Sequence, residues 1–263
     1  MHTVQSKDGT TIAYDKTGQG PALILVPAAF MDRQEYKGFI PELSDHFTVY
    51  NYDRRGRGDS GDTQPYSTQR EVEDLAAVIE TAGGEAYIYG QSSGAALTLL
   101  AASSGIGITK IAVFEPPFST GKGERELPAG APKHLMDLMA KDKWSDTMEY
   151  FLTKLVGIPA PAVAGMKSQP MWEGMRKFAH SLPYDAALTA GPAGDFLVPK
   201  AELAKIKIPT IAIDGGASWG WILETTKAVA DAIDGAQYRT LPGQDHGVDP
   251  KVIAPVLIEF FGA

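Results

Sequence analysis

The stretch AYIYGQSSGAALTLLAAS, residues 86–103, joins a strand-forming run to a helix-forming run through a turn flanked by glycines. Its opening residues are aromatic, β-branched or small, as in a buried β-strand. Its closing residues are rich in Ala and Leu, which favour a helix. Gly90 and Gly94 bracket Ser92 between the two runs. The sequence therefore predicts that Ser92 lies on a sharp turn between a strand and a helix.

Strand and helix patterns alternate on both sides of this unit. Two short strands joined at Asp8-Gly9 predict an edge hairpin, and the apolar run ALILV predicts a strand buried on both faces. Further strands are predicted at 47–53, 108–114, 208–214 and 237–241, and further helices at about 34–44, from 68 to the glycines at 83–84, 220–232 and 250–261. This alternation is typical of an α/β fold with a doubly wound, mostly parallel sheet.

The alternation stops in the middle of the chain. Residues 118–200 are helical in pattern, punctuated by Pro and Gly, and dense in Met, Trp and Phe. We expect this segment to form a helical lid, or cap subdomain. Residues 1–117 and 201–263 would then form the α/β core domain.

The amino-acid composition and net charge exclude some classes of binding partner. Hydrophobic residues make up 44% and charged residues 21% of the chain, as in a globular protein. A formal net charge of −8, with scattered Lys and Arg, argues against nucleic acid or an anionic membrane as a partner. The start, MHTVQSKDGT, has no signal pattern, and no run approaches the roughly 20 apolar residues of a membrane span. We expect a cytoplasmic protein, monomeric or homodimeric.

Ser92 is a candidate nucleophile because of its position directly after a strand and directly before a helix. A G-x-S-x-G pattern in that context is the nucleophile elbow of serine enzymes, whereas the pattern alone is only a Gly-Ser turn. A serine hydroxyl is a weak nucleophile at neutral pH. It requires a base to remove its proton and hydrogen-bond donors to stabilise the oxyanion that forms.

The candidate base is one of five histidines. His2 is close to the amino terminus, His46 precedes a strand, and His134 and His180 lie in the predicted lid. His246 follows the last predicted strand, in LPGQDHG, at the same sheet edge as an elbow serine. A histidine on a loop is often only solvated, but elimination and chain order favour His246 as the base.

GQSSG, the YDRRGRGDSGD loop after a strand, and the late LPGQDHG histidine together resemble the α/β-hydrolase superfamily over nearly the whole chain. The resemblance implies a catalytic triad in the chain order Ser, acid, His. In most relatives the acid stands in a G-x-x-D turn, but here that turn reads Gly215-Gly216-Ala217-Ser218. A serine cannot supply the negative charge that orients the histidine.

Two carboxylates remain as candidates for the acid. Glu115 ends the strand after the elbow helix, and Asp214 ends the next predicted strand of the sheet. Certain haloalkane dehalogenases and zearalenone-type lactonases carry the acid after the earlier strand, and the elbow here is similar to that of the lactonases. We favour Glu115, because a carboxylate behind an apolar run is costly unless it is paired, and keep Asp214 as the alternative.

The remaining predicted site residues supply oxyanion donors and a pocket wall. The backbone N–H groups of Ser93 and Ala29 are the expected donors. The predicted pocket residues are aromatic: Phe30, Trp172, Tyr184, Trp219 and Trp221. No cysteine is present, and no His or Asp spacing suggests zinc or calcium, so no metal and no cofactor are expected.

The resemblance implies a serine hydrolase that cleaves a carboxylic ester or lactone of moderate apolar size through an acyl-enzyme intermediate. The fold hosts other chemistries, so a cofactor-free lyase or C–C bond hydrolase with the same triad stays open. A ligand-binding, receptor-like member with negligible turnover is a third possibility.

Overall fold

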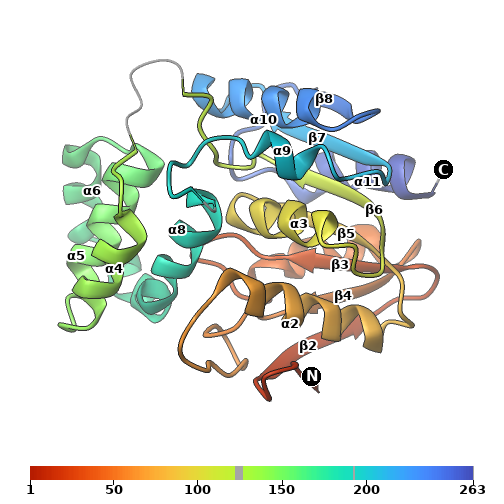
Figure 1. Cartoon of the computed structure of the whole chain (residues 1–263), viewed down its shortest axis with the longest axis horizontal. Coiled ribbons are helices and arrows are strands. Elements are labelled where there is room, and N and C mark those ends of the chain that lie inside the picture. Colours follow the sequence, from red (N-terminus) through yellow and green to blue (C-terminus); the bar gives the residue numbers. More distant parts are fainter. Residues whose placement is uncertain (122–126, 192, 263) are drawn as a thin grey trace.

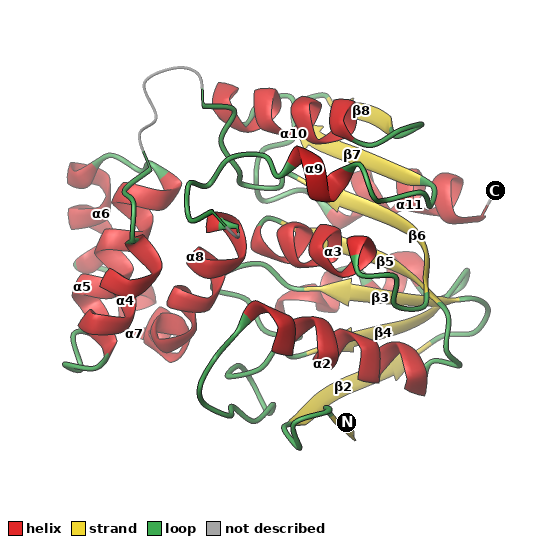
Figure 2. Ribbon diagram, in the orientation of Figure 1, coloured by secondary structure: helices red, strands yellow, loops and turns green. Residues whose placement is uncertain are grey.

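Eight strands form one sheet in the computed structural model, which describes residues 1–121, 127–191 and 193–262 (Figures 1 and 2). The strands are β1 (His2–Gln5), β2 (Thr11–Thr17), β3 (Ala22–Val26), β4 (Thr48–Tyr52), β5 (Ala86–Gln91), β6 (Ile108–Phe114), β7 (Thr210–Gly215) and β8 (Gln237–Leu241). Their order is β1-β2-β4-β3-β5-β6-β7-β8. β2 pairs antiparallel with β1 and β4, and the other pairs are parallel. The prediction of a mostly parallel α/β sheet with an edge hairpin is confirmed.

Helices cover both faces of the sheet, as the doubly wound prediction requires. One face packs against α2 (Thr68–Thr81), α3 (Ser93–Ser103) and α10 (Gly220–Ala232), and the other against α1 (Ile40–Leu43) and α11 (Pro250–Gly262). Strand residues alternate between the two cores: Ile24 belongs to the first, whereas Leu23 and Leu25 belong to the second. The short α9 (Lys200–Leu203) lies beside α3 and α10.

The helix expected at about 34–44 is interrupted. A 3₁₀ turn at Glu35–Gly38 is followed by the separate helix α1. Pro41 explains the break, because it has no N–H to donate to the carbonyl four residues earlier. The two short elements still bury Tyr36 and Leu43 against the sheet.

The helices between β6 and α9 form a layer of their own beyond the ends of the strands (Figure 1). They are α4 (Ala131–Met139), α5 (Trp144–Tyr150), a π-helical turn (Phe151–Val156), α6 (Ala160–Lys167), α7 (Pro170–Met175), a 3₁₀ helix (Arg176–Ser181) and α8 (Leu182–Ala190). We call residues 131–190 the helical insert. It has its own hydrophobic cluster, and α8 also contacts α3 of the sheet layer. The domain boundaries at 117 and 201 stay a prediction.

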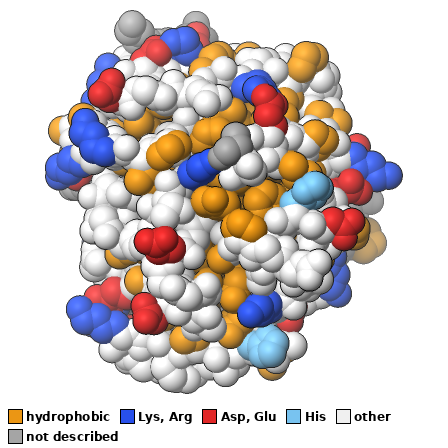
Figure 3. All heavy atoms as spheres, turned by 90° about the vertical axis from the view of Figure 1, so that its right-hand side faces the viewer, with side chains coloured by type: hydrophobic (Ala, Val, Ile, Leu, Met, Phe, Trp, Pro, Cys, Tyr) orange, Lys and Arg blue, Asp and Glu red, His pale blue; other side chains and the backbone are white. Residues whose placement is uncertain are grey.

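The surface is mixed in character. On the face that carries the carboxyl terminus, hydrophobic side chains gather near the centre, with Lys, Arg, Asp and Glu interspersed around them (Figure 3). Within the described ranges, no helix is both long and apolar enough to cross a membrane.

Candidate active site

Ser92 occupies the turn between β5 and α3 in a backbone conformation that L-residues rarely adopt, with φ 54° and ψ −122°. Two glycines make this turn possible. A Cβ on Gly90 would lie 2.5 Å from the carbonyl oxygen of Gly94, and a Cβ on Gly94 would lie 2.3 Å from that of Val26. The strain at Ser92 costs about 1–3 kcal/mol, and it places the side chain on the wall of a cavity.

Glu115 follows β6 and is completely buried. Its Oε2 lies 2.5 Å from Nδ1 of His246. Its Oε1 accepts hydrogen bonds from the Gly215 N–H at 2.8 Å and from the Ser218 hydroxyl at 2.5 Å. A carboxylate held in this way accepts a hydrogen bond from Nδ1–H of His246, and this leaves Nε2 of the neutral imidazole free to accept a proton. His246 is partly exposed and lines the same cavity as Ser92.

Asp214, the alternative acid, points elsewhere. It is also completely buried, but its Oδ2 accepts a hydrogen bond from the Tyr238 hydroxyl at 2.7 Å. Its Oδ1 has no hydrogen-bond partner among the described residues. Burial raises the pKa of Asp214. The structure thus brings Glu115, and not Asp214, to His246, and Ser218 of the expected acid turn binds Glu115 instead.

Gln91 also belongs to the site, although no sequence pattern predicted a role for it. Its side-chain Nε2 donates a hydrogen bond of 2.8 Å to the backbone carbonyl of His246. This bond ties the turn that carries Ser92 to the loop that carries His246. Its position directly before Ser92 in the G-x-S-x-G pattern was the one sequence feature that could have indicated a place in the site.

The two predicted oxyanion donors, Ser93 and Ala29, both line the cavity. Ser93 is the first residue of α3, where backbone N–H groups have no intrahelical partner. Neither amide donates a hydrogen bond to another residue that the structure describes. The loop after β3 turns through Phe30, whose φ is 58°. Both N–H groups are therefore available to a bound oxygen.

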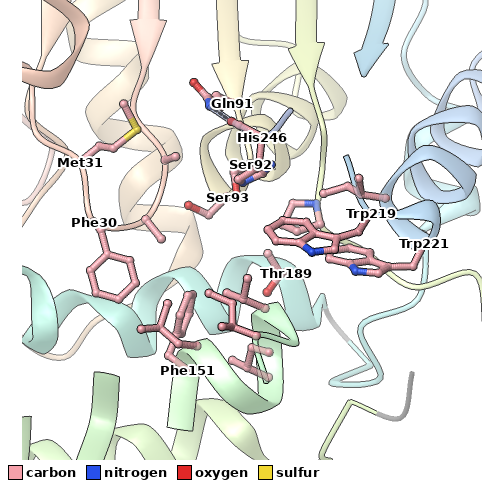
Figure 4. Close-up of a pocket in the computed structure, with 18 of the residues that line it drawn as sticks. Phe30, Met31, Gln91, Ser92, Ser93, Phe151, Thr189, Trp219, Trp221 and His246 are labelled. Atoms are coloured by element: carbon pink, nitrogen blue, oxygen red, sulfur yellow. Dashed lines mark hydrogen bonds between the residues drawn. The ribbon is translucent and has the colours of Figure 1, made fainter. Parts of the chain in front are cut away.

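The cavity has a volume of about 370 Å³ and lies between the strand ends and the helical insert (Figure 4). Its described lining contains no Lys, Arg, Asp or Glu. Apolar side chains from the insert form one wall: Phe151, Leu152, Leu155, Val156 and Ile158. Trp219 and Trp221 form another wall, with their rings stacked at 6.1 Å and an interplanar angle of 12°. Predicted pocket residues Phe30, Trp219 and Trp221 all line this cavity.

Two predicted pocket residues do not. Trp172 packs inside the hydrophobic cluster of the helical insert, and its Nε1 donates to Ser145 Oγ at 3.0 Å. Tyr184 stacks on Tyr66 with a centroid distance of 3.9 Å, and its hydroxyl binds Asp62. The expectation that they line the pocket is wrong, because helical spacing identifies an apolar face but not the neighbour that covers it.

Within the described ranges, no group of three or more His, Cys, Asp or Glu side chains could hold a metal ion. The arrangement at the strand ends consists of a strained serine, a histidine held by a buried carboxylate, and backbone N–H donors. On a sheet of this topology, such an arrangement defines the α/β hydrolases.

Comparisons with known proteins agree with this class. The family model described as "Alpha/beta hydrolase family" matches residues 23–255, and the chain belongs to this family. The chain is similar to an alpha/beta hydrolase of Sphaerobacter thermophilus, with 49% identity, a TM-score of 0.91, and coverage of 99% of this chain and 100% of that one.

Two further relatives carry descriptions of their activity. N-formylmaleamate deformylase of Pseudomonas putida is 36% identical over 120 residues, which is 44% of each chain. The chain thus matches less than half the length of the curated relatives it resembles. The structure of an enol-lactonase of Burkholderia xenovorans matches this one over 100% of both chains, with a TM-score of 0.70. Because the two sequences are only 20% identical, this match shows the fold alone.

Proposed function

We propose that this protein is a serine hydrolase that cleaves an uncharged carboxylic ester or lactone of moderate apolar size. The observation that carries the proposal is the contact between buried Glu115 and Nδ1 of His246, beside Ser92 in an apolar cavity. Ser92 is the nucleophile, His246 the general base and Glu115 the acid that orients it.

In the first half-reaction, Ser92 Oγ attacks the substrate carbonyl carbon while Nε2 of His246 takes the hydroxyl proton. The N–H groups of Ser93 and Ala29 stabilise the oxyanion, and Glu115 stabilises the imidazolium. When the intermediate collapses, His246 gives its proton to the leaving alkoxide oxygen. In a lactone, that alcohol stays attached to the acyl group.

In the second half-reaction, water replaces the alcohol. His246 removes a proton from water as the water oxygen attacks the acyl carbon. When the second tetrahedral intermediate collapses, His246 returns this proton to the departing Ser92 Oγ, and the carboxylic acid is released. In the net reaction, one ester bond is cleaved and one water is consumed, and one carboxylic acid and one alcohol group are formed.

The lining of the cavity supports the substrate class. The described lining of the cavity has no Lys or Arg to pair with a substrate carboxylate, and its apolar walls fit hydrocarbon or aromatic groups. The stacked Trp219 and Trp221 offer a flat surface to a ring. Lactones are included because the elbow resembles that of the zearalenone-type lactonases.

A panel of uncharged aryl esters, lactones and carboxylate-bearing analogues tests the proposal with wild-type protein, Ser92→Ala, and Ser104→Ala as a matched control at the far end of α3. We expect turnover of the uncharged compounds, and a loss of about 10⁴-fold or more in kcat for Ser92→Ala alone. Circular dichroism should be the same for all three proteins. Undiminished ester cleavage by Ser92→Ala would overturn the proposal.

A further inference from the structure

Four charged side chains lie buried together beneath the nucleophile turn. They are Arg54 and Arg57 of the loop after β4, Glu71 of α2, and Asp185 of α8, and each is at most 2% exposed. We call them the buried charge cluster. Their formal charges sum to zero. None of these four side chains appears in the described lining of the cavity, and the reaction above does not use them.

Asp185 is the centre of this cluster, and it comes from the helical insert. Its Oδ1 accepts hydrogen bonds from Ser93 Oγ at 2.7 Å, from Arg54 Nη1 at 2.9 Å and from Arg57 Nη2 at 2.7 Å. Arg54 is held from the other side by Glu71, at 2.6 and 2.8 Å. Burial raises the pKa of Asp185, but Arg57 and Arg54 outweigh burial and hold the pKa below its ordinary value, so the carboxylate is charged.

The cluster reaches the first oxyanion donor through the Ser93 side chain. Ser93 supplies its N–H to the oxyanion, and its hydroxyl is fixed between Asp185 and Arg54 Nη1, which lies 3.2 Å away. The Ser93 N–H belongs to the peptide whose carbonyl, that of Ser92, accepts hydrogen bonds from the Ala95 and Ala96 N–H groups at 2.9 and 3.1 Å. The first turn of α3 therefore holds one end of this donor, and the bond from Ser93 Oγ to Asp185 of the insert holds the other.

The cluster reaches the second donor through a peptide carbonyl. Arg57 Nη1 donates to the carbonyl oxygen of Ala28 at 2.6 Å. That carbonyl belongs to the same planar peptide as the N–H of Ala29, and in a trans peptide the two bonds point in opposite directions. Fixing the oxygen therefore fixes the direction of the Ala29 N–H. Arg54 donates to the carbonyl of Pro27 at 3.2 Å, which holds the preceding peptide of the same loop.

From these contacts we infer that Asp185 is a positioning residue that, through Ser93, Arg57 and Arg54, holds both N–H donors of the oxyanion hole in their working orientation. The helical insert thus contributes to the electrostatics of the site and not only to a pocket wall. A buried ion pair is a poor source of stability when an apolar replacement of the same volume is available. It is well suited to fixing polar groups in one geometry.

This inference rests on the proposed function for its chemistry. The variants Asp185→Asn and Ser93→Ala test it. Ser93→Ala keeps all four charges, so it serves where Asp185→Asn folds poorly. Asp74→Asn is the matched control. Asp74 pairs with the neighbouring buried Arg55 at 2.7 Å through both oxygens, and none of its hydrogen bonds reaches Ser93 or the loop after β3.

Two measurements separate positioning from a general loss of structure. The first is the affinity of a trifluoromethyl ketone, 1,1,1-trifluoro-4-phenylbutan-2-one, whose adduct with Ser92 carries an oxyanion, together with kcat and KM for p-nitrophenyl butyrate. The second is hydrogen exchange of the amides at 28–31, which needs no turnover.

Removing an oxyanion donor outright costs about 10²- to 10³-fold in kcat. A donor that is kept but less well oriented should cost less, about 10- to 100-fold for Asp185→Asn and about 3- to 10-fold for Ser93→Ala. The ketone should lose affinity by the same factors, KM should change less than about twofold, and exchange at 28–31 should accelerate in Asp185→Asn. Asp74→Asn should show none of these changes.

The inference is overturned if ketone affinity or exchange at 28–31 in Asp185→Asn matches Asp74→Asn, while wild-type protein remains an active esterase. If wild-type protein neither cleaves the ester nor reacts with a fluorophosphonate at Ser92, the proposed function fails separately. The exchange measurement alone then decides whether Asp185 positions the loop.

Discussion

Replacing Glu115 by Gln should disable the proposed base through a change of histidine tautomer. Oε1 of Glu115 faces two donors, the fixed N–H of Gly215 and the hydroxyl of Ser218. The glutamine must turn its carbonyl oxygen toward that N–H, because an NH₂ group there would oppose another donor. Its NH₂ group then faces Nδ1 of His246. That contact requires an unprotonated Nδ1 and therefore a protonated Nε2, which cannot take the Ser92 proton.

The magnitude follows from this geometry. Because the substitution is isosteric and the Glu115 side chain is fully buried, no space opens for a water that could replace the carboxylate as the acceptor for Nδ1–H of His246. Loss of the orienting carboxylate in a serine triad lowers kcat about 10⁴-fold. We expect a loss of about 10³- to 10⁴-fold in kcat for Glu115→Gln, with KM changed by less than about threefold, because no substrate-binding wall is altered.

The assay is pre-steady-state hydrolysis of p-nitrophenyl butyrate, which reports the acylation of Ser92 directly. Asp214→Asn is the matched control, since it changes a second fully buried carboxylate at the end of the adjacent strand. Its acylation rate should stay within about threefold of wild type. The reasoning is refuted if Asp214→Asn is crippled while Glu115→Gln keeps more than about a tenth of the wild-type rate.

Three further predictions concern Ser218, Trp219 and Asp185. Adding Ser218→Asp to Glu115→Ala should raise kcat at least about tenfold over Glu115→Ala alone, because Ser218 Oγ lies 2.5 Å from Oε1 of Glu115 and an aspartate there would bring a carboxylate to the same place. If kcat does not rise, position 218 does not adjoin the site of the acid. Trp219→Ala should raise KM for aryl esters about twofold to tenfold, as expected for the loss of about 0.5–1.5 kcal/mol of ring stacking, and leave KM for alkyl esters unchanged. The folded pKa of Asp185 lies below its ordinary value of 3.8, so its charge stabilises the fold above that pH and the effect is lost as pH falls through the folded pKa. In urea titrations, the difference in unfolding free energy between wild type and Asp185→Asn should become smaller below about pH 4. A difference that stays constant from about pH 6 to pH 3 would contradict the lowered pKa of Asp185.

The strand–turn–helix unit around Ser92 was predictable because its signals are local. Glycine flanks, a β-rich run and an Ala- and Leu-rich run fix the elements within a few residues. The bounds of α3, β6 and α10 follow their predicted ranges for the same reason. The expected helix at 34–44 failed at Pro41, a breaker that was visible in the sequence.

The sequence favoured Glu115 as the acid but left Asp214 open as the alternative. Both are carboxylates at the ends of neighbouring parallel strands, behind similar apolar runs. Long-range hydrogen bonds distinguish the two carboxylates in the structure. The Tyr238 hydroxyl donates to Asp214, whereas the Ser218 hydroxyl, in the turn after β7, donates to Glu115. A hydroxyl at the usual acid position was a usable signal, because it can donate to a carboxylate that arrives from another strand.

The buried charge cluster was beyond sequence reasoning for a similar reason. In the helical pattern of the middle segment, Asp185 resembles a solvated residue, and 128 positions separate it from Arg57. The sequence signal for this cluster was the RRGR loop, because closely spaced arginines that are buried need carboxylates or other acceptors as partners. Those partners come from α2 and α8, and only the packing of these two helices against the loop identifies them.

The order of the strands has a consequence for how the protein loses activity. Ser92 and Glu115 follow β5 and β6, which have a strand neighbour on each side, but His246 follows β8, which pairs with β7 at the end of the sheet order. β8 has one strand neighbour and mostly exposed or half-exposed side chains, and elements with few buried contacts open at a lower free energy than core strands. Partial unfolding that starts at β8 removes the base while the nucleophile turn is still folded. Enzymatic activity should therefore disappear at lower denaturant concentrations than the circular dichroism of the sheet and its helices.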